Sequence, residues 1–110
     1  MTQETATHVY SPVAKVADLA PGAAIMVEVG DLYIGVFNVG GTIYAVEAYC
    51  THALALLTEG RVLGENVECP LHGAQFSLKT GKALTEPATE DLRSYPVRIE
   101  NGAILVGVPG

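Results

Sequence analysis

Hydrophobic residues along the chain occur in short runs that are rich in β-branched side chains and often alternate with polar positions. A two-residue period of this kind is typical of β-strands, whereas helices repeat at three to four residues. The pattern predicts strands over residues 24–29, 32–39, 42–47, 66–68, 75–78, 95–100 and 103–108. We therefore expect an all-β fold with antiparallel strands.

Two dipeptides between these strands tolerate positive φ and predict tight hairpin turns. They are Gly40-Gly41 and Asn101-Gly102, of which the second suits a type I′ turn. A weak helical signal covers residues 16–19, just before the turn-forming residues 20–22. The chain has 110 residues and no repeat or linker, so we expect a single domain.

Composition supports a packed, soluble protein. Hydrophobic residues make up 49% of the chain and charged residues 16%, which argues against disorder. No apolar run approaches the roughly 18 residues of a membrane span, and residues 2–7 lack the features of a signal peptide. We expect a cytoplasmic monomer. The net charge of −6 lacks the basic surface of a nucleic-acid-binding protein, so we expect no nucleic-acid partner.

The negative charge is unevenly distributed. Between Cys50 and Thr85 three acidic residues balance three basic ones, whereas nine acidic and three basic residues lie elsewhere. An acidic body beside a neutral segment suits electrostatic steering toward a basic protein partner.

The neutral segment also holds both cysteines and two of the three histidines. They form two pairs, Cys50-Thr-His52 and Cys69-Pro-Leu-His72, separated by 16 residues that could form a hairpin. Each pair offers one thiolate and one imidazole from a tight turn, in a glycine-rich loop region where chemistry is commonly placed. His8 stands apart near the polar terminus and is expected to be a solvated surface residue.

Three interpretations of the two pairs stay open. The cysteines could be core residues or form one disulfide, with two unrelated histidines. A zinc site is a second interpretation, although zinc ligands are usually two to four residues apart and Cys-x-His is more cramped. A 2Fe-2S cluster fits the mixed pairs better, because each loop can give its cysteine to one iron and its histidine to the other.

The run from Cys50 to Phe76, CTHALALLTEGRVLGENVECPLHGAQF, resembles the Rieske proteins. Over almost its whole length the chain is similar to the Rieske ferredoxins of bacterial multicomponent aromatic-ring dioxygenases. This resemblance implies an antiparallel β-sandwich with an inserted cluster-binding subdomain at roughly residues 49–84. It also implies that Cys50 and Cys69 hold the buried iron of one 2Fe-2S cluster, and that His52 and His72 hold the outer iron.

The resemblance further implies a role in electron transfer without catalysis. Ferredoxins of this family take single electrons from an NAD(P)H-dependent flavoprotein reductase and deliver them to a terminal Rieske oxygenase. A rival within the same fold is the small Rieske-like subunit of an assimilatory nitrite reductase, which works only as part of a siroheme enzyme.

Differences from other Rieske proteins narrow the choice of subfamily and predict the reduction potential. Respiratory and photosynthetic members have a disulfide at positions matching Ala55 and Leu71, and hydroxyl donors at positions matching Ala74 and Phe76. This chain lacks both the disulfide cysteines and the hydroxyl donors, which excludes the respiratory and photosynthetic subfamily. Without these donors the reduced cluster is less stabilised, so we expect a potential on the order of −150 mV.

Several residues around the motif have expected roles. By resemblance, Leu54, Leu71 and Pro87 form an apolar rim around the two histidines. Tyr49 could either shield the cluster or simply pack. Residues 86–91, with three acidic side chains, are expected to form a solvated loop.

Overall fold

The computed structural model describes residues 8–50, 55–71, 73–85 and 90–109. Every strand pairing within these residues is antiparallel, which confirms the predicted all-β fold. Two short 3-10 helices accompany the strands, and neither is long and apolar enough to cross a membrane. In chain order the elements are β1 His8–Lys15, η1 Val16–Asp18, β2 Ala24–Val29, β3 Leu32–Val39, β4 Thr42–Glu47, η2 Leu57–Glu59, β5 Arg61–Leu63, β6 Asn66–Glu68, β7 Gln75–Ser77, β8 Ser94–Tyr95, β9 Val97–Glu100 and β10 Ala103–Pro109.

Most predicted elements are confirmed. β2, β3, β4 and β6 have the predicted bounds, and β7 and β10 differ by one residue at their ends. Both predicted hairpin turns have positive φ at their two residues: 60° and 99° at Gly40 and Gly41, and 51° and 78° at Asn101 and Gly102. The weak helical signal corresponds to η1.

Three features of the strands differ from the prediction. β1 and β5 were not expected, since Pro12 and a bulge interrupt the pattern of β1 and all three residues of β5 are exposed. The predicted strand 95–100 is divided at Pro96, which has no N–H to donate to a ladder. β8, before the proline, pairs with β4, and β9, after it, pairs with β10.

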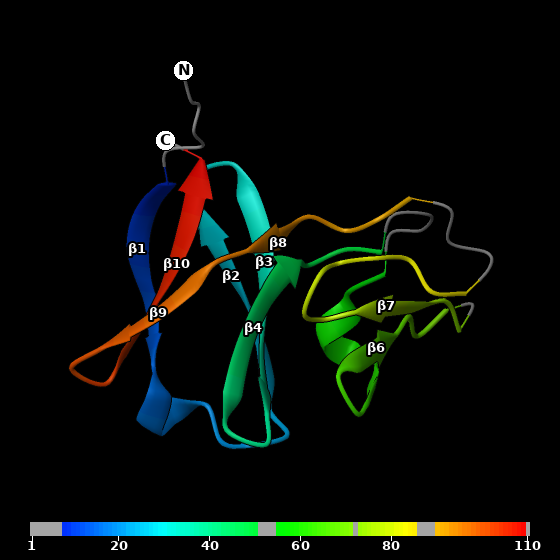
Figure 1. The fold of residues 1–110 in the computed structure, drawn as a ribbon, viewed down its shortest axis with the longest axis horizontal. Coiled ribbons are helices and arrows are strands. Elements are labelled where there is room, and N and C mark those ends of the chain that lie inside the picture. The colour runs from blue at the N-terminus through cyan, green and yellow to red at the C-terminus, as the bar shows by residue number, and fades with distance from the viewer. Residues whose placement is uncertain (1–7, 51–54, 72, 86–89, 110) are drawn as a thin grey trace.

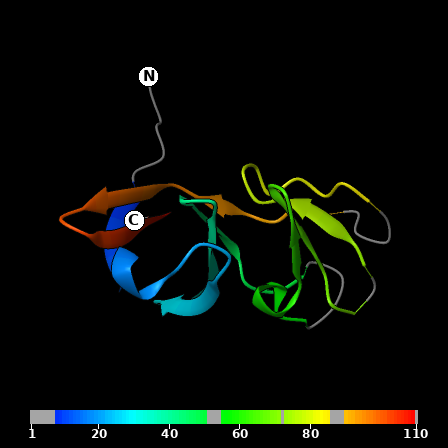
Figure 2. The same ribbon diagram turned by 90° about the horizontal axis from the view of Figure 1, so that it is seen from below.

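Two of the three sheets face each other and form what we call the base lobe (Figure 1). One sheet has the order β1-β10-β9, and the other has the order β2-β3-β4-β8. Ile34, Val36 and Ala45 from the second sheet pack with Ile104 and Val106 from the first in one buried core. The chain leaves the second sheet after β8 and joins the first sheet at β9, and both strands lie in the orange segment of Figure 2.

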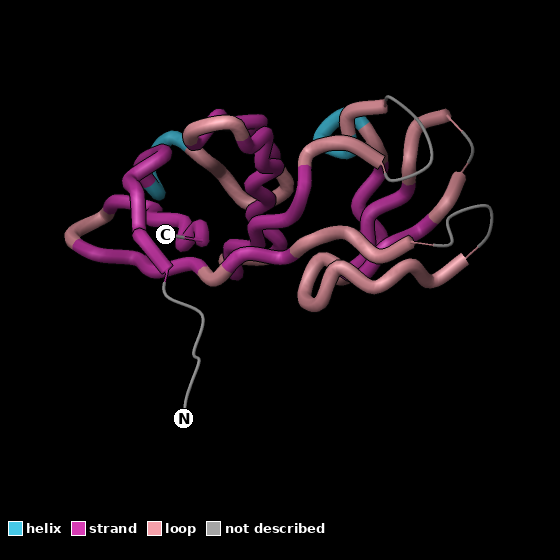
Figure 3. Tube along the Cα trace, turned by 90° about the horizontal axis from the view of Figure 1, so that it is seen from above, coloured by secondary structure: helices cyan, strands magenta, loops and turns pink. Residues whose placement is uncertain are grey.

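The third sheet, β5-β6-β7, lies in a separate lobe beside the base, which we call the cysteine lobe (Figures 1 and 3). Its core includes Leu57, Val67 and Phe76 and also receives Phe37 and Val46 from the base sheet. Alternation along β3 explains this arrangement, because Ile34 and Val36 point to one face and Phe37 to the other. The sheet β2-β3-β4-β8 is therefore buried on both faces over part of its area.

Gly35 permits the close contact between the two lobes. A Cβ atom at this position would lie 3.2 Å from Cγ2 of Thr58 in η2 and 3.0 Å from the ring of Phe37. A larger residue would therefore push η2 away from β3.

Candidate metal centre

The two cysteine loops are closed by the same backbone hydrogen bond. The N–H of Cys50 donates to the carbonyl oxygen of Ala55 at 3.0 Å, and the N–H of Cys69 donates to the carbonyl oxygen of Ala74 at 2.7 Å. In the second loop the N–H of Gly73 also donates to the Cys69 carbonyl at 3.1 Å, and Gly73 has a φ of 74°. Each cysteine thus begins a loop whose closing residue lies five positions later.

Both loops are anchored to regular structure. The first follows β4, where the N–H of Ala48 donates to the Tyr33 carbonyl at 2.9 Å and that of Leu57 donates to the Ala48 carbonyl at 2.8 Å. The second connects β6 to β7. Gly60 brings the two together, because a Cβ there would lie only 1.9 Å from the carbonyl oxygen of Glu68, the residue before Cys69.

The structure brings both predicted cysteine ligands into one core. Cys50 is 6% exposed and Cys69 is 1% exposed, and both belong to the core of the cysteine lobe. Neither cysteine takes part in a disulfide within the described residues. Two buried thiols in one core, each starting a loop closed by the same backbone hydrogen bond, are a donor set that fits the cysteine side of an iron-sulfur cluster.

The predicted histidine ligands, His52 and His72, lie outside the described residues. Among the residues that are described, no three His, Cys, Asp or Glu side chains gather closely enough to hold a metal ion. His8 is exposed at the start of β1, as expected for a surface residue.

The two residues that stand where other Rieske proteins have hydroxyl donors, Ala74 and Phe76, have no exposed surface. Ala55, which stands at one of the disulfide positions, is 6% exposed. Leu71, at the tip of the second loop, is 61% exposed, in keeping with a position on an apolar rim. The two other expected rim residues, Leu54 and Pro87, lie outside the described part of the chain.

Tyr49 packs against another aromatic residue and remains partly exposed. Its ring meets the ring of Tyr33 edge-on, with centroids 5.9 Å apart and an interplanar angle of 82°. Packing is therefore an observed role of Tyr49. Sequence reasoning missed Tyr33 because it lies 16 residues before Tyr49, in β3, and no local pattern connects the two.

Asp91 is more than a solvated acid. It is exposed, but its Oδ1 accepts a hydrogen bond of 2.8 Å from the N–H of Ala83. The next residue, Leu92, donates its N–H to the Gly81 carbonyl at 2.7 Å. Asp91 is thus exposed, as expected for a solvated loop, and its side chain also fastens its segment to the cysteine lobe.

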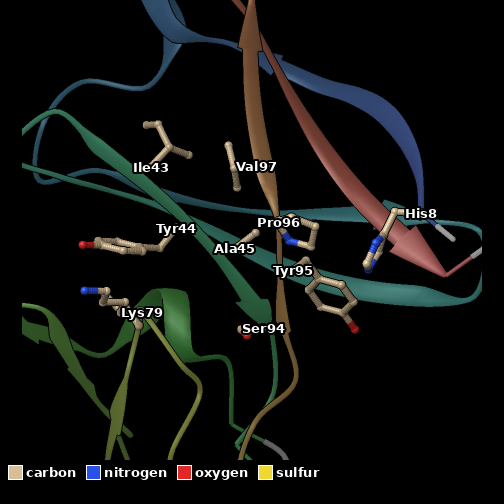
Figure 4. A pocket seen from close by; sticks show the side chains of 10 residues that line it. His8, Ile43, Tyr44, Ala45, Lys79, Ser94, Tyr95, Pro96 and Val97 are labelled. Carbon is tan, nitrogen blue, oxygen red and sulfur yellow. The ribbon is translucent and has the colours of Figure 1, made fainter. Parts of the chain in front are cut away.

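A groove of about 540 Å³ separates the end of β7 from β4 and the β8-β9 segment (Figure 4). At its side the hydroxyl of Tyr44 donates to Oε2 of Glu65 at 3.0 Å, a hydrogen bond that connects the two lobes. Desolvation, and then the hydrogen bond and charge of Glu65, raise the pKa of Tyr44, so its hydroxyl remains a donor at neutral pH. The groove is lined by His8, Ile43, Tyr44, Ala45, Leu78, Lys79, Ser94, Tyr95, Pro96 and Val97, and neither cysteine is among them.

Comparisons with known proteins identify chains of similar sequence and fold. The chain is 46% identical over 95 residues to the ferredoxin subunit of 3-phenylpropionate/cinnamic acid dioxygenase from Escherichia coli K12, covering 86% of this chain and 89% of the relative. It is 35% identical to a chain in the complex of reduced oxygenase and oxidized ferredoxin of carbazole 1,9a-dioxygenase, with a TM-score of 0.83 over 89% of this chain and 92% of that one.

A second solved structure shares the fold at lower identity. It is a chain assigned as the small subunit of an NADH-dependent nitrite reductase from Mycobacterium tuberculosis, 23% identical with a TM-score of 0.84 over 94% of this chain and 97% of that one. The family model for the Rieske 2Fe-2S domain matches residues 9–96, which include both cysteine loops. The chain therefore belongs to the Rieske 2Fe-2S domain family.

Proposed function

We propose that this protein is the ferredoxin of an aromatic-ring dioxygenase system and transfers single electrons. The observation that carries the proposal is the pair of identically closed loops that place Cys50 and Cys69 in one buried core. The 46% identical relative, a dioxygenase ferredoxin subunit, supports the same role. In this role the chain is an electron-transfer component and catalyses no reaction alone.

The proposed ligands are Cys50 and Cys69 for one iron, and His52 and His72 for the other. A 2Fe-2S cluster held in this way supplies a centre that accepts and releases one electron. The buried core around the cysteines excludes water from the thiolate side and fixes the two loops against β4 and β6. We propose residues 49–84 as the approximate bounds of the cluster-binding subdomain, which contain all of the sheet β5-β6-β7.

The proposed partners are an NAD(P)H-dependent flavoprotein reductase and a terminal Rieske oxygenase. The solved complex of a 35% identical ferredoxin with an oxygenase supports the second partner. We propose a monomer, because a carrier must meet its two partners in turn. We propose a cytoplasmic location, because the electron donor depends on NAD(P)H.

The rival role, as small subunit of a nitrite reductase, shares the fold at 23% identity, so the fold alone does not separate the two functions. The higher identity to dioxygenase ferredoxins favours electron transfer to an oxygenase.

Reconstitution tests the proposed function. The purified protein, mixed with NADH and with the flavoprotein reductase and terminal oxygenase of the same organism, should support hydroxylation of an aromatic substrate. Omitting the protein should abolish product formation. A stable complex with a siroheme protein, together with no electron transfer to the oxygenase, would contradict the proposal and favour the nitrite reductase.

A further inference from the structure

An exposed aromatic pair lies where the base lobe meets the first cysteine loop. Tyr33 is 47% exposed and Tyr49 is 36% exposed, although their rings contact each other edge-on. Tyr49 directly precedes Cys50, and Tyr33 lies on the face of β3 that also carries Gly35 beneath η2. The pair therefore occupies the uncovered part of the face on which the cysteine lobe sits.

Two residues of β2 extend this surface. Glu28 is the cross-strand partner of Tyr33, and Met26 is the partner of Gly35. Cross-strand partners lie on the same face of a sheet, about 5 Å apart at Cβ. Met26 is 36% exposed and Glu28 is also exposed. We call Met26, Glu28, Tyr33 and Tyr49 the seam patch.

Glu28 has no ion-pair partner within the part of the chain that the structure describes, since no Lys, Arg or His there lies within ion-pair distance of its carboxylate. A carboxylate beside exposed aromatic rings is complementary to a guanidinium group, which stacks on a ring and pairs with an anion at the same time. The chain makes the stacking part of such a contact internally at a distant site, where the guanidinium of Arg98 lies 4.0 Å from the ring centroid of Tyr10.

We propose that the seam patch belongs to the docking surface for the terminal oxygenase and receives an arginine from a basic region of that partner. The inference rests on the proposed function. The net charge of −6 favours a basic partner surface, and Tyr49 makes the patch continuous with the first cysteine loop. The oxygenase is chosen over the reductase because a similar ferredoxin, 35% identical, forms a complex with its oxygenase.

Matched variants of the cluster-loaded, full-length protein test this proposal. Tyr33→Ala removes a ring, Tyr33→Phe retains it, and Glu28→Gln removes the charge. Two controls on β9 make similar changes on the other sheet of the base: Ile99→Ala at a 50% exposed side chain, and Glu100→Gln with the same change in net charge. Binding to the oxygenase of the same organism is measured by calorimetry, and reduction by the reductase is measured by stopped flow.

Tyr33→Ala should raise the Kd for the oxygenase about fivefold, and Glu28→Gln should raise it about threefold with a weaker dependence on salt. Tyr33→Phe and both β9 controls should bind like the wild type. The visible spectrum and potential should stay unchanged in all variants, which separates docking from damage to the cluster.

Equal affinity of Tyr33→Ala and the wild type would overturn the inference while leaving the proposed function intact. A loss confined to reduction by the reductase would also overturn it, because the patch would then serve the other partner. If the wild-type protein itself neither binds nor reduces the oxygenase, the proposed function fails, and the inference fails with it.

Discussion

Cys50 and Cys69 lie in the core of the cysteine lobe, with 6% and 1% of their surfaces exposed. What distinguishes them is that each begins a loop closed five residues later by the same hydrogen bond. Their spacing to the histidines is a local pattern and is readable from the sequence, so the candidate ligands could be predicted. The contacts of Tyr33 with Tyr49 and of Asp91 with Ala83 join segments that are distant in sequence, so no local pattern predicts them.

Replacing either Cys50 or Cys69 with serine should abolish the cluster, because serine offers no soft thiolate ligand to iron. Iron and acid-labile sulfide should fall from about two of each per chain to near zero. Retention of both in Cys69→Ser would show that the thiol is only a core side chain. Zinc in the native protein, in place of iron and sulfide, would favour the zinc-site interpretation.

Adding a hydroxyl at Ala74 should raise the reduction potential. This residue has no exposed surface, closes the second cysteine loop, and matches the position of a serine donor in high-potential members of the family. A hydrogen bond to the cluster stabilises its reduced form, so Ala74→Ser should shift the potential in the positive direction from about −150 mV.

Ala55→Ser is the matched control, because it adds the same hydroxyl at the closing position of the first loop, which matches a disulfide cysteine and not a hydroxyl donor in respiratory and photosynthetic members. Protein-film voltammetry measures both variants. An unchanged potential in Ala74→Ser, or a clearly positive potential in the native protein, would contradict the explanation based on missing donors.

At the scale of elements, the strands with clear alternation were predictable and those shaped by neighbours were not. β2, β3 and β4 have regular alternation, and turns that contain glycine mark their ends. β5 has three exposed residues and is a strand only because β6 lies beside it. The sequence shows a proline at position 96, where the strand is divided. It does not show which sheet each half joins, because β8 pairs with β4 and β9 pairs with β10.

Gly60 is required by packing and not by its backbone conformation. Its φ of −84° suits any residue, but a Cβ would lie 1.9 Å from the Glu68 carbonyl oxygen. Gly60→Ala should therefore push η2 away from β6 and destabilise the protein by about 3 kcal/mol.

Gly64→Ala is the control for this prediction. Its φ is 64° with no atom within 4 Å of the added methyl, so strain alone should cost about 1 kcal/mol. Thermal unfolding of both variants measures the difference. Equal losses of stability would show that Gly60 is needed only for chain flexibility.

At the scale of the whole molecule, the segment from Cys50 to Thr85 is neutral, and the net negative charge lies on the rest of the chain. Long-range attraction by these acidic residues should speed encounter with a basic partner, whereas contact at the cysteine loops sets the docked geometry. Raising the salt concentration should therefore slow association moderately and leave the transfer rate in the docked complex almost unchanged.

Leu71→Asp should abolish turnover with the oxygenase while the cluster and its spectrum persist. Leu71 is 61% exposed at the tip of the second cysteine loop, where an added carboxylate would be buried without a partner on docking. The cost should be several kcal/mol, on the order of 3. Val9→Asp, at a 53% exposed position on β1, adds the same charge away from the loops and should turn over normally. Full turnover by Leu71→Asp would place electron exit elsewhere.

Ligation by two cysteines and two histidines is the central claim, and pulsed electron paramagnetic resonance tests it most directly. The protein is produced with ¹⁵N-labelled histidine, reduced by one electron, and examined for coupling between the cluster spin and nitrogen. We predict strong couplings from two imidazole nitrogens that change with the isotope, and the loss of one in His52→Cys or in His72→Cys. A reduced cluster with no histidine coupling would contradict the account.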